Sequence, residues 1–168
     1  MSGIRFAALS LRDASFTQTR VENHHPVLGF APNQALTPTG LYPGNEALQS
    51  VLRAINPRLL FPSNAQAQLS GHFHLFEMVS FATAQPTQLI SGNGGRMGRC
   101  AAAACARAQP APGAVVETIV STNEYGFMTI EQESDGAWRI KASDRRGQPV
   151  TTCMLRDAKT RCTPETLP

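Results

Sequence analysis

The sequence predicts a mixed α/β fold, in which layered strands are covered by at least one helix and end in antiparallel hairpins toward the C-terminus. Three observations lead to this class: one amphipathic segment near residues 45–56, short strand-like segments on both sides of a Gly-His pair, and strongly alternating segments in the last third. A chain of 168 residues suits one domain with its own core. We therefore expect residues 1–168 to form a single domain.

Charge and hydropathy exclude two classes of partner. The net charge of +3 comes from 15 basic and 12 acidic side chains that are scattered along the chain, without a dense basic block. This pattern gives little support to nucleic-acid binding. The apolar runs are far shorter than the roughly 18 to 20 residues that span a bilayer. We therefore expect neither a nucleic-acid partner nor insertion in a membrane.

The four cysteines fall in two local pairs, Cys100 with Cys105 and Cys153 with Cys162. An even count with short spacings is typical of disulfides in an oxidising compartment, and free or metal-bound thiols are the alternative. Neither pair has the C-x₂-C spacing usual for zinc. We therefore expect an extracellular or periplasmic location. Residues 1–13 make a poor export signal, because their apolar stretch is too short, so we expect the exported chain to lack its natural beginning.

The first 44 residues contain little regular pattern. "IRFAALSL" at residues 4–11 is the only plausible strand before residue 20, and "RDASFTQTR" is expected to be a polar connection. The following segment, "VENHHPVLGFAPNQALTPTGLYPG", contains four prolines and three glycines. This composition predicts a long loop, and such loops often contain functional sites.

A helix is expected to start after Asn45, which can cap it, with Glu46 in the first turn and Pro57 beyond its end. Its spacing places five apolar residues on one face: Ala47, Leu48, Val51, Leu52 and Ile55. "AQLSGHFH" then predicts a strand that runs into a turn at Gly71, "HLFEMVSFA" a second strand, and "TQLISG" a third.

In an extended "HFHLFEMVSF", His72 and His74 would point to the same side because strand side chains alternate. Glu77 is expected to be a solvent-facing strand residue, with support of a metal site as the alternative. Residues 93–113 predict a surface excursion that a Cys100–Cys105 disulfide could close.

The last third predicts hairpins. "VVETIVS", "YGFMTIEQE" and "AWRIKASD" alternate well, and an Asp-Gly turn in "ESDGA" joins the last two. Trp138 is expected to pack in the core or in a hairpin. "VTTCMLRD" follows, and Cys153 and Cys162 would bracket a closing hairpin around "LRDAKTR".

The four histidines form two tight clusters, "NHHP" at residues 23–26 and "GHFH" at residues 71–74. Imidazole is a good ligand for zinc, iron or manganese. Taken alone, each cluster has a simpler alternative that is favoured: a half-exposed strand with two solvated histidines for His72 and His74, and a polar loop with one histidine packed on Phe30 for His24 and His25. The two clusters together favour a metal site. The "SGNGG" run at residues 91–95 does not match a phosphate-binding loop.

The order of "HHP", an amphipathic helix, "LSGHFH" and "QLISGNGG" resembles the C-terminal half of the calcineurin-like metallophosphoesterases, close to their secreted branch that is similar to purple acid phosphatases. The resemblance covers about residues 21–95, and it extends more weakly to the C-terminal hairpins. It implies that the chain is the C-terminal part of a metallophosphoesterase domain, a mixed layered β-sandwich.

The resemblance also implies a two-metal centre that contains iron, zinc or manganese and acts on a phosphate ester. In it, His24 and His72 would bind one metal and His74 the other. His25 would lie beside the site, either supporting a ligand or contacting the substrate phosphate in a catalytic role.

The D-x-H, G-D-x-x-D and G-N-H-[DE] motifs that complete this centre in the family are absent from the sequence. Three neutral imidazoles can hold one cation, but they cannot neutralise two. We therefore expect a metal-dependent phosphohydrolase whose isolated chain is weak or inactive, either a fragment, a late-start gene model or a degenerate paralogue. The alternatives are a non-catalytic, disulfide-stabilised binding or structural domain and a protein with a single three-histidine zinc ion. An exposed sheet face could then associate with another surface.

Overall fold

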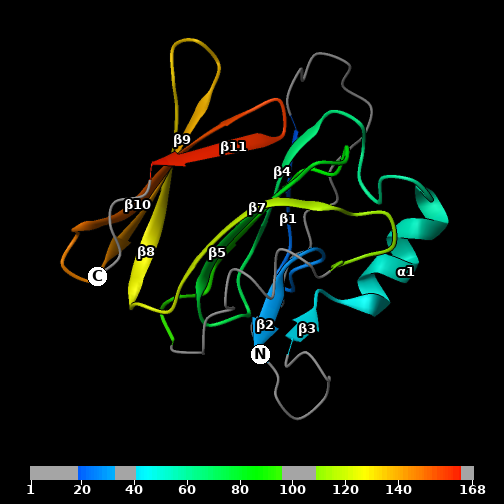
Figure 1. Cartoon of the computed structure of the whole chain (residues 1–168), viewed down its shortest axis with the longest axis horizontal. Helices are drawn as coiled ribbons and strands as arrows, with labels where there is room; N and C mark the ends of the chain where they lie inside the picture. The colour runs from blue at the N-terminus through cyan, green and yellow to red at the C-terminus, as the bar shows by residue number, and fades with distance from the viewer. Residues whose placement is uncertain (1–18, 33–40, 96–108, 164–168) are drawn as a thin grey trace, which may run out of the picture.

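The computed structural model describes residues 19–32, 41–95 and 109–163. Their elements form three layers (Figure 1): a five-stranded sheet in the middle, a four-stranded sheet on one side, and helix α1 with a small two-stranded sheet on the other. This agrees with the predicted mixed, layered class at the coarse level, although strands greatly outnumber helices among the described residues.

The five-stranded sheet has the order β1 (Thr19–Glu22), β4 (Ala65–Ser70), β6 (Thr87–Ser91), β5 (Phe76–Phe81) and β7 (Val116–Thr122). Strands β1, β4 and β6 are parallel, whereas β5 runs antiparallel to β6 and β7. All six residues of β5 are buried, because layers cover both faces of the sheet. The carboxyl ends of the three parallel strands meet at one edge, which is where ligands bind in many sheets of this type.

The four-stranded sheet is an antiparallel meander of β8 (Gly126–Gln132), β9 (Trp138–Asp144), β10 (Pro149–Arg156) and β11 (Lys159–Thr163). This confirms the predicted hairpins, including the Asp135–Gly136 turn, where Gly136 has φ +83°. Apolar residues of both sheets pack between the layers: Ala67, Phe76, Met78, Leu89, Ile140, Ala142, Cys153 and Leu155.

The edges of this core agree with two further expectations. Trp138 packs against the core between the sheets, as predicted, and the Arg20 guanidinium lies 4.2 Å from its ring centroid. The outer face of the four-stranded sheet is polar, with Arg139 paired to Glu131 and Glu133.

The turn between β10 and β11 attaches this sheet to the central one. Asp157 and Ala158 both have positive φ, which is the geometry of a tight two-residue hairpin. The Ala158 N–H donates to Gln66 Oε1 at 2.6 Å, and Thr87 Oγ1 donates to the Ala158 carbonyl at 2.8 Å. Lys159 Nζ reaches the carbonyls of β5 and of the segment after it. The closing hairpin therefore fixes the relative position of the two sheets.

Helix α1 (Glu46–Ile55) starts as predicted, since Asn45 Oδ1 accepts the Leu48 N–H at 3.0 Å. The predicted apolar face is only partly correct. Leu48 and Leu52 pack on the core, but Val51 and Ile55 are 63% and 75% exposed. Gln49 is buried instead, and its Nε2 donates to the carbonyls of Val27 and Pro110. The face of the helix that carries Gln49 therefore points to the core, where the amide satisfies two buried carbonyls that would otherwise lack a donor.

Three short strands lie where the sequence predicts a polar connection and a loop: β1, β2 (Phe30–Pro32) and β3 (Leu41–Pro43). β2 pairs with β3, and β1 pairs with β4. All three strands depend on these partners, so their own sequences give no strong local signal for a strand. The predicted strand at residues 4–11 and the predicted Cys100–Cys105 disulfide lie outside the described residues.

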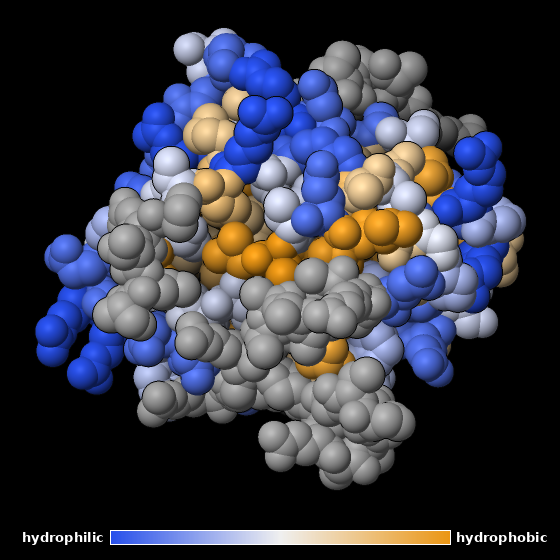
Figure 2. Space-filling view, viewed as in Figure 1, coloured by the Kyte–Doolittle hydropathy of each residue, from blue (hydrophilic) through white to orange (hydrophobic). Residues whose placement is uncertain are grey.

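Exposed apolar surface gathers at one edge of the sheet. Figure 2 shows an apolar band over β7, the edge strand of the five-stranded sheet, and Val115, the residue just before β7, is 45% exposed. The middle of that sheet is buried on both faces. No helix in the described ranges is long and apolar enough to span a membrane.

A disulfide joins Cys153 of β10 to Cys162 of β11, as predicted. Replacing both cysteines with alanine should lower the free energy of unfolding by about 2 to 3 kcal/mol, because the link closes a loop with a sequence separation of 9. Urea denaturation under oxidising conditions measures this. Met154→Gln on the same strand, where the side chain is 37% exposed, is the control and should change stability by well under about 1 kcal/mol. An unchanged midpoint for the double variant would contradict the prediction.

Candidate metal centre

The two histidine clusters meet at the carboxyl ends of β1 and β4. His24 and His25 follow β1, His72 follows β4, and these strands are parallel neighbours. Backbone hydrogen bonds join the two loops: the Gly71 N–H donates to the His24 carbonyl at 3.2 Å, and the Asn23 N–H donates to Leu69 at 3.1 Å. The convergence of residues 48 positions apart therefore follows from strand pairing.

Within the described part of the chain, His24, His25 and His72 form the only group of three side chains whose ligand atoms could hold one metal ion. All of these atoms lie within 4.8 Å of one another, and His72 Nδ1 is 3.2 Å from His24 Nε2. Two nitrogens that each lie about 2.0 to 2.1 Å from a tetrahedral zinc ion would be about 3.3 Å apart. The His24–His72 spacing therefore matches that of two imidazole ligands on one divalent transition metal, and His25 lies within reach of the same point.

The loop that presents His72 is a pair of tight turns and not a strand. The Phe73 N–H donates to Gly71 at 2.7 Å and the Leu75 N–H to Phe73 at 2.8 Å, so each turn spans three residues. His72 has φ +63°, which is unfavourable for a residue with a side chain. The expected extended alternation of His72 and His74 is therefore wrong. Strain of this kind is often found at functional sites.

His74 lies outside the group formed by the other three histidines. It is exposed, and it lies against the loop that follows β6: a Cβ added to Gly95 would be 2.6 Å from His74 Nδ1. The structure thus brings His25 together with His24 and His72, whereas the resemblance pairs His24 with His72 and assigns His74 to another metal.

The electrostatics of the cluster favour the neutral form of His72. Desolvation lowers the pKa of His72, and the neighbouring His25, His24 and His74 lower it further because their positive charges would repel its own. Neutral imidazole is the form that binds metal ions. His24 and His72 are exposed and His25 is at least partly so, which leaves the cluster open to an incoming ion.

Beneath the cluster, a row of three buried polar side chains supports the segment that follows "HHP". These side chains come from the adjacent strands β4, β6 and β5, and each accepts a backbone N–H from residues 27–30. The pairs are Val27 N–H to Gln68 at 3.4 Å, Leu28 N–H to Gln88 at 3.1 Å, and Phe30 N–H to Glu77 at 2.7 Å. Gln68 Nε2 also donates to Asn23 Oδ1, which links this row to the first residue of "NHHP".

Glu77 is fully buried, and the expectation of a solvent-facing side chain is therefore wrong. Residues 27–30 cover the face of β5 on which it lies, which periodicity within β5 could not reveal. Burial raises the pKa of Glu77 to about 8, although the Phe30 N–H opposes part of this rise. Its Oε2 has no hydrogen-bond partner among the described residues. Glu77 is therefore mainly a neutral carboxylic acid at pH 7.

The supporting amides Gln68 and Gln88 were not singled out from the sequence. The only available signal was a glutamine within a strand most of whose residues are buried. A polar residue at such a position indicates a hydrogen-bond partner from elsewhere in the chain.

Comparison of the chain with protein-family models and with curated proteins gives no match. The site is therefore defined by its geometry: an open cluster of three imidazoles at the carboxyl end of parallel strands.

The raised pKa of Glu77 predicts a pH-dependent stability. Because its pKa rises from 4.5 to about 8, the folded state holds this proton more tightly than the unfolded state does. The contribution of Glu77 to the free energy of unfolding is fully present below pH 4.5 and is lost as the pH rises toward 8. Glu77→Gln removes this loss and keeps an acceptor for the Phe30 N–H. At pH 7 the variant should be more stable than the native chain by up to ~3 kcal/mol.

Urea denaturation between pH 5 and pH 8 measures this difference. Glu117→Gln is the matched control, because Glu117 is an exposed carboxylate on β7, and it should leave the pH slope unchanged. Equal slopes for Glu77→Gln and the native chain would show that Glu77 does not hold a proton in the folded state.

Proposed function

We propose that this chain supplies the histidine part of a metal-dependent phosphohydrolase centre, in which His24, His25 and His72 hold one divalent ion. The observation that supports this best is the convergence of three imidazoles from two parallel strands, one of them on a strained turn. Zinc, iron and manganese all accept imidazole ligands. A phosphate ester as substrate rests on the resemblance of the "HHP" and "GHFH" motifs to the metallophosphoesterases.

The chemistry follows from the charges of the ligands. A bound divalent ion would polarise a phosphoryl oxygen and lower the pKa of a coordinated water. Three neutral imidazoles leave its double positive charge uncompensated, and this favours an anionic ligand such as a phosphate group. His74 is exposed and near enough to His72 for their charges to interact, so it could donate a hydrogen bond to such an anion.

The proposed centre holds one ion and not two. Among the described residues no carboxylate joins the three imidazoles, and a second ion would need one to offset its charge. We therefore expect this chain alone to have only weak phosphohydrolase activity. We also propose a location outside the cytoplasm, because the Cys153–Cys162 disulfide would persist in an oxidising compartment.

A non-catalytic binding or structural domain is the second candidate. The same lack of a carboxylate in the cluster supports it, as does the disulfide that stabilises the outer sheet. The apolar band over β7 is then the surface through which we propose association with another protein surface. The two candidates differ in whether the chain binds a metal.

Titration of metal-free protein with Zn²⁺ should give about one ion per chain. His24→Ala and His72→Ala should each weaken binding by at least about a hundredfold, because each removes a ligand from a set of three. His74→Ala is the matched control and should retain binding. Calorimetry measures the affinity, and the absorbance of a Co²⁺ complex reports the geometry. Absence of binding to the native chain would favour the non-catalytic domain, and retained binding in the His24→Ala, His72→Ala double variant would place the metal elsewhere.

Hydrolysis of p-nitrophenyl phosphate in the presence of Mn²⁺, Fe²⁺ or Zn²⁺ tests the proposed reaction. We expect a slow rate that requires the metal and is lost in His72→Ala, because that variant lacks a ligand of the cluster. Glu131→Gln on the polar outer sheet should leave the rate unchanged. A rate that is equal with and without His72 would come from another source and would contradict the proposal.

A further inference from the structure

We infer that an open cleft beside the loop after β6 binds a planar heteroaromatic ring carried by a phosphate ester, with the phosphate at the histidine cluster. The placement of the phosphate rests on the proposed function, whereas the ring site stands on its own residues. This cleft, called here the ring cleft, has a volume of about 350 Å³ and is lined by Asn93, Gly94, Tyr125, Gly126, Phe127 and Arg145.

Two aromatic side chains of the ring cleft are open to solvent. Tyr125 is 44% exposed and Phe127 is 46% exposed, and both line the same cleft. A single exposed aromatic residue needs no explanation, but two that line one cleft offer ring faces on which a planar group can stack. Stacking of this type does not select one particular ring, because every aromatic ring has a π-face.

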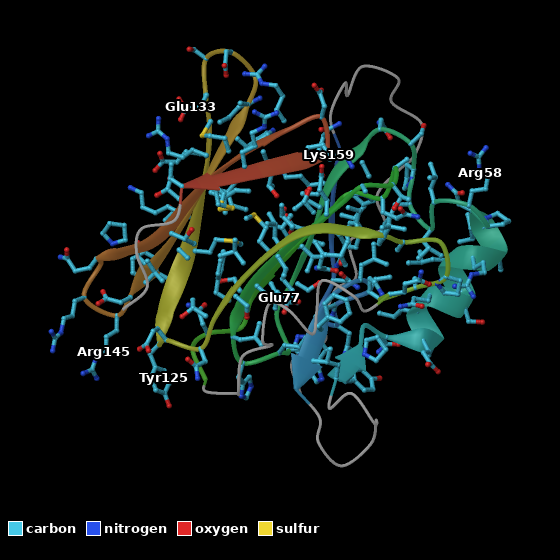
Figure 3. All side chains as sticks on the ribbon, viewed as in Figure 1. Arg58, Glu77, Tyr125, Glu133, Arg145 and Lys159 are labelled. Carbon is cyan, nitrogen blue, oxygen red and sulfur yellow. A yellow bond between two sulfur atoms is a disulfide. The ribbon has the colours of Figure 1, made fainter. Side chains whose placement is uncertain are left out.

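Arg145 adds a positive charge to the lining of the ring cleft. The ion pairs among the described residues involve Arg139 and Arg156, and none involves Arg145. Figure 3 places Arg145 and Tyr125 at the same corner of the molecule, where the β9–β10 and β7–β8 turns lie. A planar guanidinium both stacks on rings and donates several parallel hydrogen bonds. A ring with nitrogen or oxygen acceptors satisfies both properties, which a purely hydrocarbon ring does not.

The turns that form the ring cleft are held in place before any ligand binds. The Gly126 N–H donates to the Asn93 carbonyl at 3.0 Å, and Asn93 is itself buried. Gly126 cannot carry a side chain, since a Cβ there would lie 1.9 Å from the Ser143 carbonyl oxygen. Asp144 Oδ1 accepts two backbone N–H groups of the following turn, at 2.8 and 2.9 Å. A preformed cleft loses less entropy when it binds a ligand.

The ring cleft and the histidines share one loop. Asn93 and Gly94 line the cleft, and the next residue, Gly95, contacts His74, which is two positions from His72. Along this path the Cα atoms of Gly94 and His72 are less than about 20 Å apart. A nucleoside monophosphate, with a ring at one end and a phosphate at the other, is the simplest ligand that carries both of the groups that the two sites would recognise.

Adenosine 5′-monophosphate and ribose 5-phosphate are the probes, because they share the sugar and the phosphate and differ in the ring. With the Zn²⁺-loaded chain, calorimetry should show that the nucleotide binds at least about tenfold more tightly. Tyr125→Ser should reduce this ratio to near one and leave ribose 5-phosphate unaffected. Arg145→Gln should weaken nucleotide binding severalfold, whereas Arg146→Gln, a neighbouring charge that does not line the cleft, should not.

Equal affinity for the two probes, or an equal effect of Arg145→Gln and Arg146→Gln, would overturn the ring cleft while leaving the metal proposal intact. Adenosine without phosphate separates the two ideas. If the native chain binds no metal but binds adenosine in a manner that Tyr125→Ser abolishes, the proposed function fails and the ring cleft stands. Circular dichroism verifies that each variant is folded, and Phe127→Ser gives a second test of stacking.

Discussion

The histidine cluster keeps its place because three polar side chains of the central sheet accept hydrogen bonds from the backbone of residues 27–30. This segment is buried and forms few ladder hydrogen bonds, so its N–H groups would otherwise be unsatisfied at a cost of about 1 to 3 kcal/mol each. Gln68, Gln88 and Glu77 lie side by side on β4, β6 and β5, and they meet this need in one row. The position of "HHP" at the end of β1 follows from that row.

The loop on the other side of the cluster is held by packing and not by polar groups. His72 has a positive φ, a conformation that costs on the order of 1 to 3 kcal/mol. The residues that follow offset this cost, because Phe73 is 5% exposed and Leu75 is fully buried in a small apolar cluster. The two apolar side chains fix the tight turns, and the His72 imidazole that precedes them is left at the surface. The cluster thus combines one loop held by hydrogen bonds with one held by apolar burial.

The parts of the fold that the sequence predicted are those whose signals are local. The Asn45 cap, the Asp135–Gly136 turn and the Cys153–Cys162 hairpin each depend on residues only a few positions apart. The parts that it missed depend on distant segments: β1 exists only through pairing with β4, and the burial of Glu77 comes from residues 27–30. The motifs identified the histidines, but only the tertiary structure could group His25 with His24 and His72 and separate His74 from them.

Two kinds of group lie near the carboxyl ends of the parallel strands: the imidazoles, and the residues of the ring cleft. The imidazoles would provide neutral ligands, so the charge of a bound ion would remain available to an anion at this solvent-exposed cluster. The β7–β8 and β9–β10 turns meet the loop after β6 and add rings and a guanidinium, which in our proposal would recognise the rest of the ligand. Because Gly126 and Asn93 are bonded to each other, the second layer is fixed to the loop after β6, and through Gly95 to His74. The disulfide-closed outer sheet therefore stabilises the fold and also positions the groups that would select a ligand for the cluster.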